Sequence, residues 1–305
     1  HWDKFVRRLA DAKYRVYVTG SNAKMLSKEV ATTLGGRFFI YDAYPYSFKE
    51  YLAAQQVELR EHWEYDTIQR SEVKRHLNEY FYYGGLPEIL SFKNKRAMLS
   101  SLYQKIYLGD ICARNNIKND RVLNILIKKM AESVKQPLSY NRLKNVIVAT
   151  GSPISVPTTI DYAEYASDSW LILPMENEIG KLTEKEMQKK YYFVDNGLLN
   201  LFLMNSETSL LENVVAVELC RRFGKKNVFF LNAEKEIDFI VPDEKLAIQV
   251  SYSIKDATTY NREVPPLVKY AKAHQDWKCL LITYDEEGTE EGIPVVSVWK
   301  WLMEV

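Results

Sequence analysis

The chain has 305 residues, a length that favours two or three domains over one. Its apolar share of 47% and charged share of 27% exclude a disordered or fibrous chain. The net charge of +1 gives no overall attraction for nucleic acid, and no apolar run reaches the roughly 20 residues that span a bilayer. Three cysteines without metal-like spacing, and no signal-peptide pattern, predict a cytoplasmic protein with no membrane partner.

The beginning of the chain predicts part of a parallel α/β fold. Apolar residues recur at helical spacing over residues 1–13. Short apolar runs predict strands at 14–18 and 38–41, with a helix at 24–34 between them and another at 47–54. Two strands are too few for a sheet domain and the first residue is not Met, so we expect partner strands upstream of residue 1.

The middle of the chain predicts helices and then a winged helix. Residues 53–118 have helical periodicity, interrupted by two glycines before Pro87, which suits the first turn of a new helix. In residues 119–205 we expect helices at 122–134, 139–145 and 155–166, wing strands at 170–173 and 190–194, and a turn at 195–197. The charged run at 176–190 between the wing strands is expected to be a solvated face.

The last hundred residues, 206–305, predict a compact α/β unit of ordinary domain size. Its expected elements are a helix at 209–223, strands at 227–231, 236–241 and 246–252, a helix at 261–273, a strand at 278–284, and a final strand and helix. The fold class predicted for the whole chain is therefore multidomain α/β.

Short motifs run through the whole chain in a fixed order. They are Trp2-Asp-Lys-Phe-Val-Arg-Arg-Leu9, Val16-Tyr-Val-Thr-Gly-Ser-Asn-Ala23, Gly36-Arg37, Tyr44-Pro-Tyr-Ser-Phe48, Tyr83-Gly-Gly-Leu-Pro-Glu88, Tyr192-Phe-Val-Asp-Asn-Gly-Leu198 and Leu211-Glu-Asn-Val-Val-Ala-Val-Glu-Leu219. Together they resemble a bacterial and archaeal family of AAA+-type ATPases with a C-terminal domain of unknown function. The resemblance implies a truncated nucleotide-binding core in 1–52, a helical lid in 53–118, a winged helix in 119–205 and the C-terminal domain in 206–305.

The resemblance also implies where the nucleotide binds. In that family a glycine-rich phosphate loop and an acidic Mg²⁺-binding strand precede the helix that begins at Trp2, and this chain contains no G-x-x-x-x-G-K-[ST] motif. We therefore expect ATP and Mg²⁺ to bind the full-length protein and neither to bind tightly to this chain. The chain alone is expected to be inactive, because the Lys and Mg²⁺ that neutralise phosphate charge are missing.

Four residues near the N-terminus are candidates for contact with the nucleotide. Thr19, Ser21 and Asn22 follow an expected strand, and by the resemblance they occupy the sensor position that orients water near a γ-phosphate. The alternative for them is a capped helix start. Arg37 follows two glycines and could project toward phosphate as an arginine finger, or lie on the surface near a helix C-terminus. Ser21 and Arg37 are the catalytic candidates.

The winged helix offers candidates for contact with DNA. Arg142, Lys144, Thr158 and Thr159 lie on or near its expected recognition helix, with both threonines on the exposed face. That helix also carries three acidic residues, which would repel DNA. DNA, a partner protein and a second copy of the chain all stay open as partners.

The C-terminal unit resembles the restriction-endonuclease-like core, written PD-(D/E)xK. Asp238 matches the metal-binding Asp and Glu218 the acid on the preceding helix. Gln249 stands where a Glu is expected and Ser251 where a Lys is expected, which removes one metal ligand charge and the cationic activator. Either Lys255 or Lys235 could replace that activator. Without the resemblance, Asp238 would be a polar residue on the solvent face of a strand.

The function predicted from the sequence is an ATPase fragment whose full-length form couples ATP binding or hydrolysis to binding of DNA or protein. One alternative is a metal-dependent DNA nuclease, which Gln249 and Ser251 disfavour. The other is a non-catalytic interaction or regulatory module. The four histidines have no partner at metal-ligand spacing, so no metal site is predicted from them.

Overall fold

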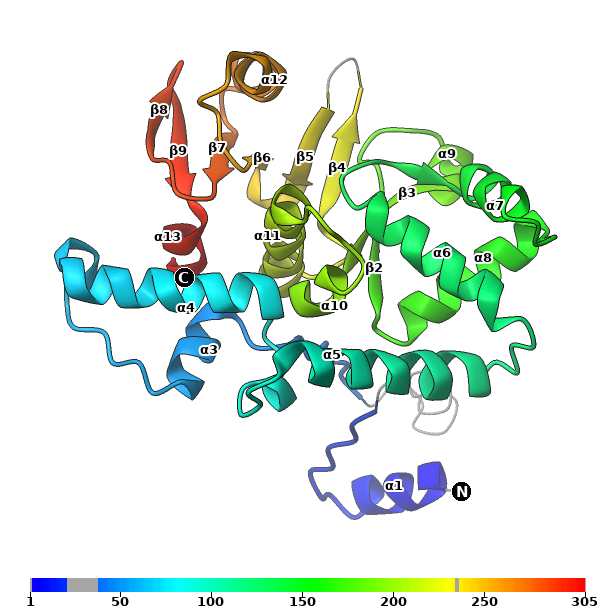
Figure 1. Cartoon of the computed structure of the whole chain (residues 1–305). Helices are drawn as coiled ribbons and strands as arrows, with labels where there is room; N and C mark the ends of the chain where they lie inside the picture. The colour runs from blue at the N-terminus through cyan, green and yellow to red at the C-terminus, as the bar shows by residue number, and fades with distance from the viewer. Residues whose placement is uncertain (1, 21–37, 234–235, 305) are drawn as a thin grey trace.

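The computed structural model describes residues 2–20, 38–233 and 236–304, which form a mixed α/β protein that is mostly helical (Figure 1). The longer helices are α1 (Trp2–Asp11), α4 (Thr67–Tyr83), α5 (Lys95–Gln104), α6 (Asp120–Glu132), α7 (Tyr140–Ala149), α8 (Val156–Asp168), α11 (Glu207–Phe223) and α12 (Ala257–Ala273). The shorter helices are α3 (Phe48–Ala54), α9 (Leu182–Met187), α10 (Asn196–Asn200) and α13 (Val298–Met303). A π-helical stretch, η3 (Lys105–Ala113), continues α5, and 3₁₀ turns lie at Trp63–Tyr65, Pro87–Ile89 and Pro242–Glu244.

The N-terminal region differs from the sequence prediction. Residues 14–18 and 38–41, expected as strands, have no strand structure, and most of their side chains are exposed. A strand exists only when a neighbour pairs with its backbone, and the described residues supply no neighbour to either segment. The helix expected at 24–34 lies outside the described residues. The helix expected at 1–13 is present as α1, and the one at 47–54 as α3, capped by Ser47.

Helices α4 and α5 run across the molecule above α1 in Figure 1. Helix α4 begins at Asp66, whose carboxylate accepts the backbone N–H groups of Ile68 and Gln69. It ends at Gly84, which has a positive φ of 77°. Pro87 then starts a 3₁₀ turn, as the sequence predicts. This turn lies between α4 and α5, and η3 leads from α5 to the next unit of the chain.

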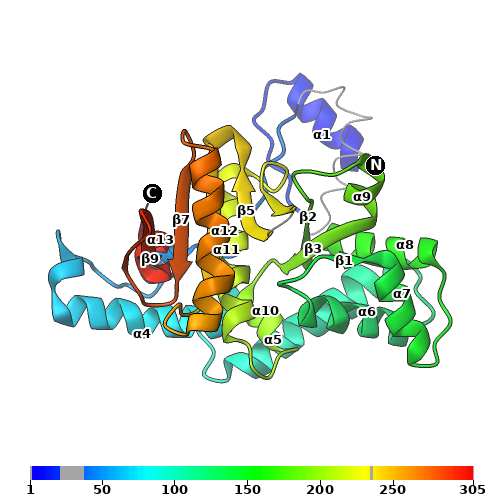
Figure 2. The same cartoon turned by 90° about the horizontal axis from the view of Figure 1, so that it is seen from above.

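Residues 120–193 form a unit of three longer helices, the short helix α9 and a small sheet, here called the three-helix unit. Its strands are β1 (Leu138–Ser139), β2 (Ile172–Met175) and β3 (Gln188–Phe193), paired antiparallel in the order β1-β3-β2. The three helices expected here are present as α6, α7 and α8, and the hydroxyls of Ser139 and Ser155 cap the latter two. Figure 2 shows this unit on one side of the molecule and strands β7 to β9 on the other.

The C-terminal sheet has six strands in the order β4-β5-β6-β7-β9-β8. They are β4 (Phe229–Asn232), β5 (Glu236–Val241), β6 (Leu246–Ser251), β7 (Lys278–Thr283), β8 (Gly288–Glu290) and β9 (Ile293–Ser297). Strands β4, β5 and β6 pair antiparallel, whereas β7 runs parallel to β6 and β9 parallel to β7. The expected helices and strands of this region are all present.

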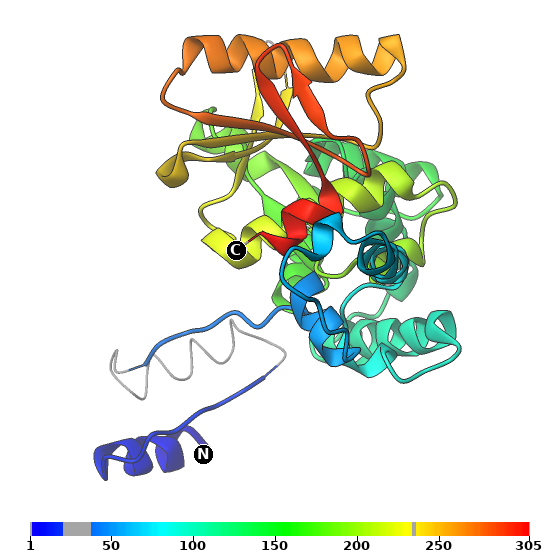
Figure 3. The same cartoon turned by 90° about the vertical axis from the view of Figure 1, so that its left-hand side faces the viewer.

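Successive side chains of a strand point to opposite faces of a sheet. Apolar residues occupy both sets of positions here, so both faces of the sheet are buried. Ile248 and Val250 join the main core with α11, while Ala247 and Cys279 join a second core with α12. Figure 3 shows α12 covering one face and the other helices lying beyond the opposite face. No helix among the described residues is both long and apolar enough to cross a membrane.

The β2–β3 connection (residues 176–187) covers the open edge of the sheet at β4. The backbone of Phe230 donates to the carbonyl of Glu176 at 3.1 Å and accepts the N–H of Glu178 at 2.8 Å. Between them, the Asn177 side chain accepts the N–H of Asn232 at 3.0 Å and donates to its carbonyl at 3.4 Å. An unpaired sheet edge is thereby closed by the three-helix unit.

Candidate functional site

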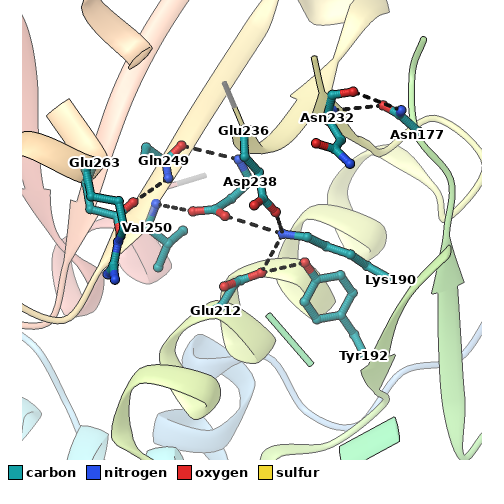
Figure 4. A network of polar contacts seen from close by, with 11 residues as sticks. Asn177, Lys190, Tyr192, Glu212, Asn232, Glu236, Asp238, Gln249, Val250 and Glu263 are labelled. Atoms are coloured by element: carbon teal, nitrogen blue, oxygen red, sulfur yellow. Dashed lines mark hydrogen bonds and ion pairs between the residues drawn. The ribbon is translucent and has the colours of Figure 1, made fainter. Parts of the chain in front are cut away.

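A buried lysine lies at the centre of three carboxylates, and the four residues are here called the carboxylate cluster (Lys190, Glu212, Glu236 and Asp238; Figure 4). The Lys190 ammonium is 2.8 Å from Glu236, 3.1 Å from Glu212 and 3.4 Å from Asp238, and its side chain is 0% exposed. The carboxylates come from β5 and α11, whereas the lysine comes from β3 of the three-helix unit. The cluster therefore joins two parts of the chain.

Further hydrogen bonds hold the carboxylates in place. The Tyr192 hydroxyl donates to Glu212 at 2.8 Å, and the Val250 N–H donates to Asp238 at 2.9 Å. Burial alone would lower the pKa of Lys190, but Glu212 and its neighbours raise it well above its usual value, so the amine is charged. Burial and the nearby Glu212 raise the pKa of Asp238 well above its usual value, although Lys190 opposes the shift.

The structure corrects the sequence prediction for Glu218. Its carboxylate pairs with Arg221 and Arg222 on its own helix, at 3.0 and 2.8 Å, and the acid that faces the lysine beside Asp238 is Glu212. Six residues turn an α-helix by about 240° beyond one full turn, so Glu212 and Glu218 point in different directions. Helical periodicity shows that the two acids lie on different faces of α11. It could have selected Glu212 only if the face of α11 that packs on the sheet had been known.

The other nuclease-type positions lie near Asp238 but make different contacts. Gln249 accepts the Asp238 N–H at 3.3 Å and donates to Glu263 at 2.6 Å. The Ser251 hydroxyl donates to the carbonyl of Ser253 at 3.0 Å. Asp238 is only 6% exposed, so it does not lie on a solvent face of the strand.

The lysine at this site is not one that the sequence suggested. The Lys255 side chain is 83% exposed and its nearest acid is Glu286, at 3.9 Å. Lys235 lies outside the described residues. Lys190 was expected at the end of a solvated run. Helix α9, which precedes it, is indeed mostly exposed, but the Lys190 side chain is buried and points into the carboxylate cluster. Within the described part of the chain, no group of three or more His, Cys, Asp or Glu side chains is placed to hold a metal ion.

A second junction links the N-terminal region to α11 through residues 44–47, here called the strap. The Arg221 guanidinium donates to the carbonyl of Pro45 at 2.8 Å and lies over the Tyr44 ring, 5.4 Å from its centroid. The Tyr44 hydroxyl donates to the carbonyl of Cys220 at 3.3 Å. On its other side the strap pairs with α4, because the Tyr80 hydroxyl donates to the carbonyl of Tyr46 at 2.9 Å.

Glu218 organises this junction. One of its carboxylate oxygens accepts from Arg221, the residue that binds the strap, and the other accepts from Arg222. Arg222 in turn donates to the carbonyl of Trp301 in α13 at 3.0 Å. A carboxylate that fixes two guanidinium groups restricts their rotamers and so places both donors. The residue predicted as part of a nuclease site is thus a structural centre between the strap, α11 and α13.

Asp195 completes the contact between α4 and the C-terminal region. Its carboxylate accepts the N–H of Gly85 at 2.8 Å and those of Gly197 and Leu198 at 2.8 and 3.3 Å, so it caps α10. The sequence predicts a turn at 195–197, but the Asp begins a helix instead. Burial raises the pKa of Asp195 to about 6, although these backbone N–H groups oppose the shift.

Of the four predicted nucleotide residues, the structure describes only Thr19. Thr19 is exposed in an irregular segment after α1, and Ser21, Asn22 and Arg37 lie outside the described residues. Their roles stay predictions.

The residues predicted to contact DNA are divided between surface and core. Arg142 is exposed on α7, and Lys144 and Thr158 are partly exposed. Thr159 is 0% exposed and its hydroxyl donates to the carbonyl of Ser155 at 2.9 Å, so its expected place on an exposed face is wrong. Thr159 is the fourth residue of α8 and lies on the face of that helix that is turned toward the core rather than toward solvent.

Comparisons with known proteins show two family models and two relatives to which the chain is similar. A family model described as an AAA domain matches residues 1–52, and one described as a domain of unknown function (DUF8612) matches residues 74–209. An uncharacterized protein, MJ1544, of Methanocaldococcus jannaschii is 33% identical over 99% of this chain and 71% of its own length. An uncharacterized protein of Haemophilus influenzae is 32% identical over 99% of this chain and 74% of its own length. No solved structure matches. The chain therefore belongs to the family of these two proteins, with part of an AAA domain at its N-terminus.

Proposed function

We propose that this protein is an ATP-dependent switch in which the AAA domain controls a C-terminal binding module. The AAA match over residues 1–52 supports nucleotide binding by the longer protein. The strap supports the coupling, because it lies inside that matched segment and accepts hydrogen bonds from Arg221 of α11 and Tyr80 of α4. A movement of the AAA domain would therefore act on two elements outside the matched segment, α4 and α11, at once.

The strap is suited to transmit a movement because its partners are themselves fixed. Glu218 holds Arg221, and Arg221 also lies 3.7 Å from Glu50 in α3. The Tyr46 N–H donates to the carbonyl of Gly85 at 2.8 Å, and the N–H of the same glycine donates to the Asp195 carboxylate. Coupling between sites needs a contiguous set of packed and hydrogen-bonded groups, and these contacts form one from α3 to α10.

The output of the switch is proposed to be a partner protein rather than DNA. Helices α6, α7 and α8 with β1-β3-β2 have the order of a winged helix, in which α8 would enter a major groove. The exposed positions of α8 include Asp161 and Glu164, which repel phosphate. The β2–β3 connection, which would form the wing, is hydrogen-bonded to β4 and is not free to reach a duplex.

The C-terminal sheet is proposed to be a non-cleaving relative of the nuclease core. Helix α11, strands β4-β5-β6, helix α12 and parallel strand β7 follow the order of that core, which supports the likeness. Cleavage needs a divalent cation held by carboxylates and a cationic group near the attacking water. Gln249 and Ser251 supply neither, and the Lys190 ammonium fills the space between the carboxylates.

Binding of ATP is expected to change amide hydrogen exchange in the strap and at the end of α11. The measurement compares the full-length protein with and without a non-hydrolysable ATP analogue, and the Tyr46 N–H is the group to follow because it is hydrogen-bonded to Gly85.

Steady-state assays are expected to show ATP turnover that Arg37→Ala lowers at least tenfold, because an arginine finger stabilises the charge of the transition state. Unchanged exchange in the strap despite nucleotide binding would contradict the coupling, and absence of turnover would remove the ATPase.

Neither binding nor cleavage of DNA is expected. Titration of labelled duplex DNA at about 50 mM salt should show no saturable binding, because phosphate contacts are strongest at low salt. Incubation of supercoiled plasmid with Mg²⁺ or Mn²⁺ should leave it intact. Arg142→Ala is the matched variant: salt-dependent binding that this change weakens would restore the DNA hypothesis, and metal-dependent nicking lost in Asp238→Ala would restore the nuclease hypothesis.

A further inference from the structure

Positive charge is concentrated in residues 93–144, which run from the start of α5 into α7. This stretch contains twelve Lys or Arg residues and three Asp or Glu residues, which gives it a net charge of +9. The whole chain carries only +1, so the remaining residues carry −8. A separation of charge of this size favours association with a partner of the opposite sign.

Helices α6 and α7, with the loop before α6, present part of this charge to solvent at residues here called the basic face (Lys118, Arg121, Lys128, Arg142 and Lys144). The first four are exposed and Lys144 is partly exposed. None of the five forms an ion pair with an acid among the described residues. Two of the three acids in the stretch are already paired elsewhere. Asp110 pairs with Arg114 at 3.1 Å. Glu132 pairs with Lys129 at 3.3 Å.

Helical geometry places basic and apolar groups together on α6. Arg121 and Lys128 are seven residues apart, close to two full turns, so they lie on the same side of the helix. The partly exposed Ile125 lies one turn from each of them. The Arg121 guanidinium donates at 3.4 Å to the carbonyl of Thr150, which follows α7 and lies two residues after the exposed Val148. Figure 2 shows α6 and α7 at the same end of the molecule, and the two helices are in contact.

This mixture of groups fits an acidic protein segment better than a nucleic acid. Protein interfaces combine arginine with apolar groups, whereas proteins that bind single strands stack the bases on exposed aromatic side chains. Helix α6 has no aromatic residue, and the one in α7, Tyr140, is buried. Duplex DNA is disfavoured by α8, which contacts both helices and carries Asp161 and Glu164 at exposed positions. Their carboxylates would repel the phosphates of a rigid duplex.

The acidic run of the chain itself, at residues 285–291, is already engaged. Asp285 pairs with Lys74. Glu287 pairs with Lys300 at 2.5 Å. These acids are not available to the basic face of a second copy of the chain, which favours a different protein as the occupant.

We propose that the basic face binds an acidic segment of a partner protein, in which Asp or Glu residues alternate with apolar ones. The guanidinium and ammonium groups of the face bind the carboxylates of that segment, and Ile125 and Val148 contact its apolar side chains. This inference rests on the proposed function, because it names the chemistry of the partner that the switch engages.

The test measures binding of a fluorescein-labelled peptide of Glu-Glu-Leu repeats to the full-length protein by fluorescence anisotropy. At about 50 mM salt, where charge pairs are weakly screened, the peptide is expected to bind, and its affinity should fall as salt is added. A peptide of Gln-Gln-Leu repeats is expected not to bind. Arg121→Glu combined with Lys128→Glu should weaken binding of the Glu peptide by roughly tenfold, because two attractions become repulsions.

The matched control is Lys226→Glu combined with Lys272→Glu. Both lysines are exposed in the C-terminal unit, so the control changes the net charge equally and is expected to leave binding within about twofold. Lys128→Glu combined with Arg142→Glu guards against a loss of folding, because it leaves the hydrogen bond at the end of α7 intact. This second variant is also expected to weaken binding by roughly tenfold.

The proposal is overturned if the Glu peptide does not bind, or if the control weakens binding as much as the basic-face variants do. Tighter binding of labelled poly-uridine RNA than of the peptide, lost in the basic-face variants, would overturn it in favour of a nucleic acid. A lower molecular mass of these variants in light scattering would overturn it in favour of a second copy of the chain. ATP turnover and strap exchange are measured separately, so failure here would leave the ATP-dependent switch standing.

Discussion

Replacing Gly197 with alanine is expected to destabilise the protein by about 3 kcal/mol. A Cβ atom there would lie 2.1 Å from the carbonyl oxygen of Tyr83 and 2.9 Å from a methyl carbon of Leu99. The first contact is with backbone and cannot be relieved by a rotamer change. Overpacking of this kind costs roughly 1–3 kcal/mol, and moving α10 away from α4 adds the loss of hydrogen bonds at about 1 kcal/mol each.

Those hydrogen bonds come from the two asparagines on either side of Gly197 in α10. Asn196 donates to the carbonyl of Phe81 at 3.0 Å, and Asn200 donates to the carbonyl of Tyr82 at 3.0 Å. Both carbonyls belong to the end of α4, so α10 is anchored where a larger residue 197 would push it off. The measurement is chemical denaturation of the wild type and the variant.

Gly109 provides the matched control for this prediction. It lies in η3, and a Cβ there would meet no atom within 4 Å. Gly109→Ala is therefore expected to be neutral or to stabilise by about 0.5–1 kcal/mol, because alanine loses less entropy than glycine in a helix. If Gly197→Ala also lies within about 0.5 kcal/mol of the wild type, α10 does not pack on α4 as described.

The elements that the sequence predicts correctly are those fixed by local pattern. Apolar residues at helical spacing predict α11, and alternation with flanking turn residues predicts β5 and β6. The strands expected at 14–18 and 38–41 are wrong because short apolar runs predict a strand without showing that it has a partner. Residues 195–197 are misjudged because Asp is as suitable for a helix N-cap as for a turn.

The candidate site could be predicted only in part, because its decisive contacts are long-range. Asp238 and Gln249 are recognised from their spacing on neighbouring strands. Lys190 lies 48 residues before Asp238 in a different unit of the fold, and no local pattern relates the two. Glu212 differs from the predicted Glu218 by less than two helical turns, so only the position of the facing sheet decides between them.

The pH dependence of stability is expected to show a loss that depends on Asp195. Its folded-state pKa is raised from 3.8 to about 6 by burial, so the folded protein binds this proton more tightly than the unfolded chain does. The contribution is fully present below about pH 4 and is lost as the pH rises through about 6. The free energy of unfolding should fall over that range by about 3 kcal/mol from this group.

Asp195→Asn isolates this effect. The amide NH₂ cannot accept the N–H of Gly85, so the variant should be less stable by about 1–3 kcal/mol even at neutral pH. A protonated carboxyl oxygen still accepts that N–H, and the wild type should therefore exceed the variant by about 3 kcal/mol more at pH 4 than at pH 7. The control is Asp256→Asn at the exposed start of α12, where hydrogen bonds from Thr259 lower the pKa of the Asp and the wild-type advantage should instead grow with pH. A stability difference between the wild type and Asp195→Asn that stays constant from pH 4 to 7 would mean that Asp195 keeps an ordinary pKa, with its three backbone donors outweighing burial.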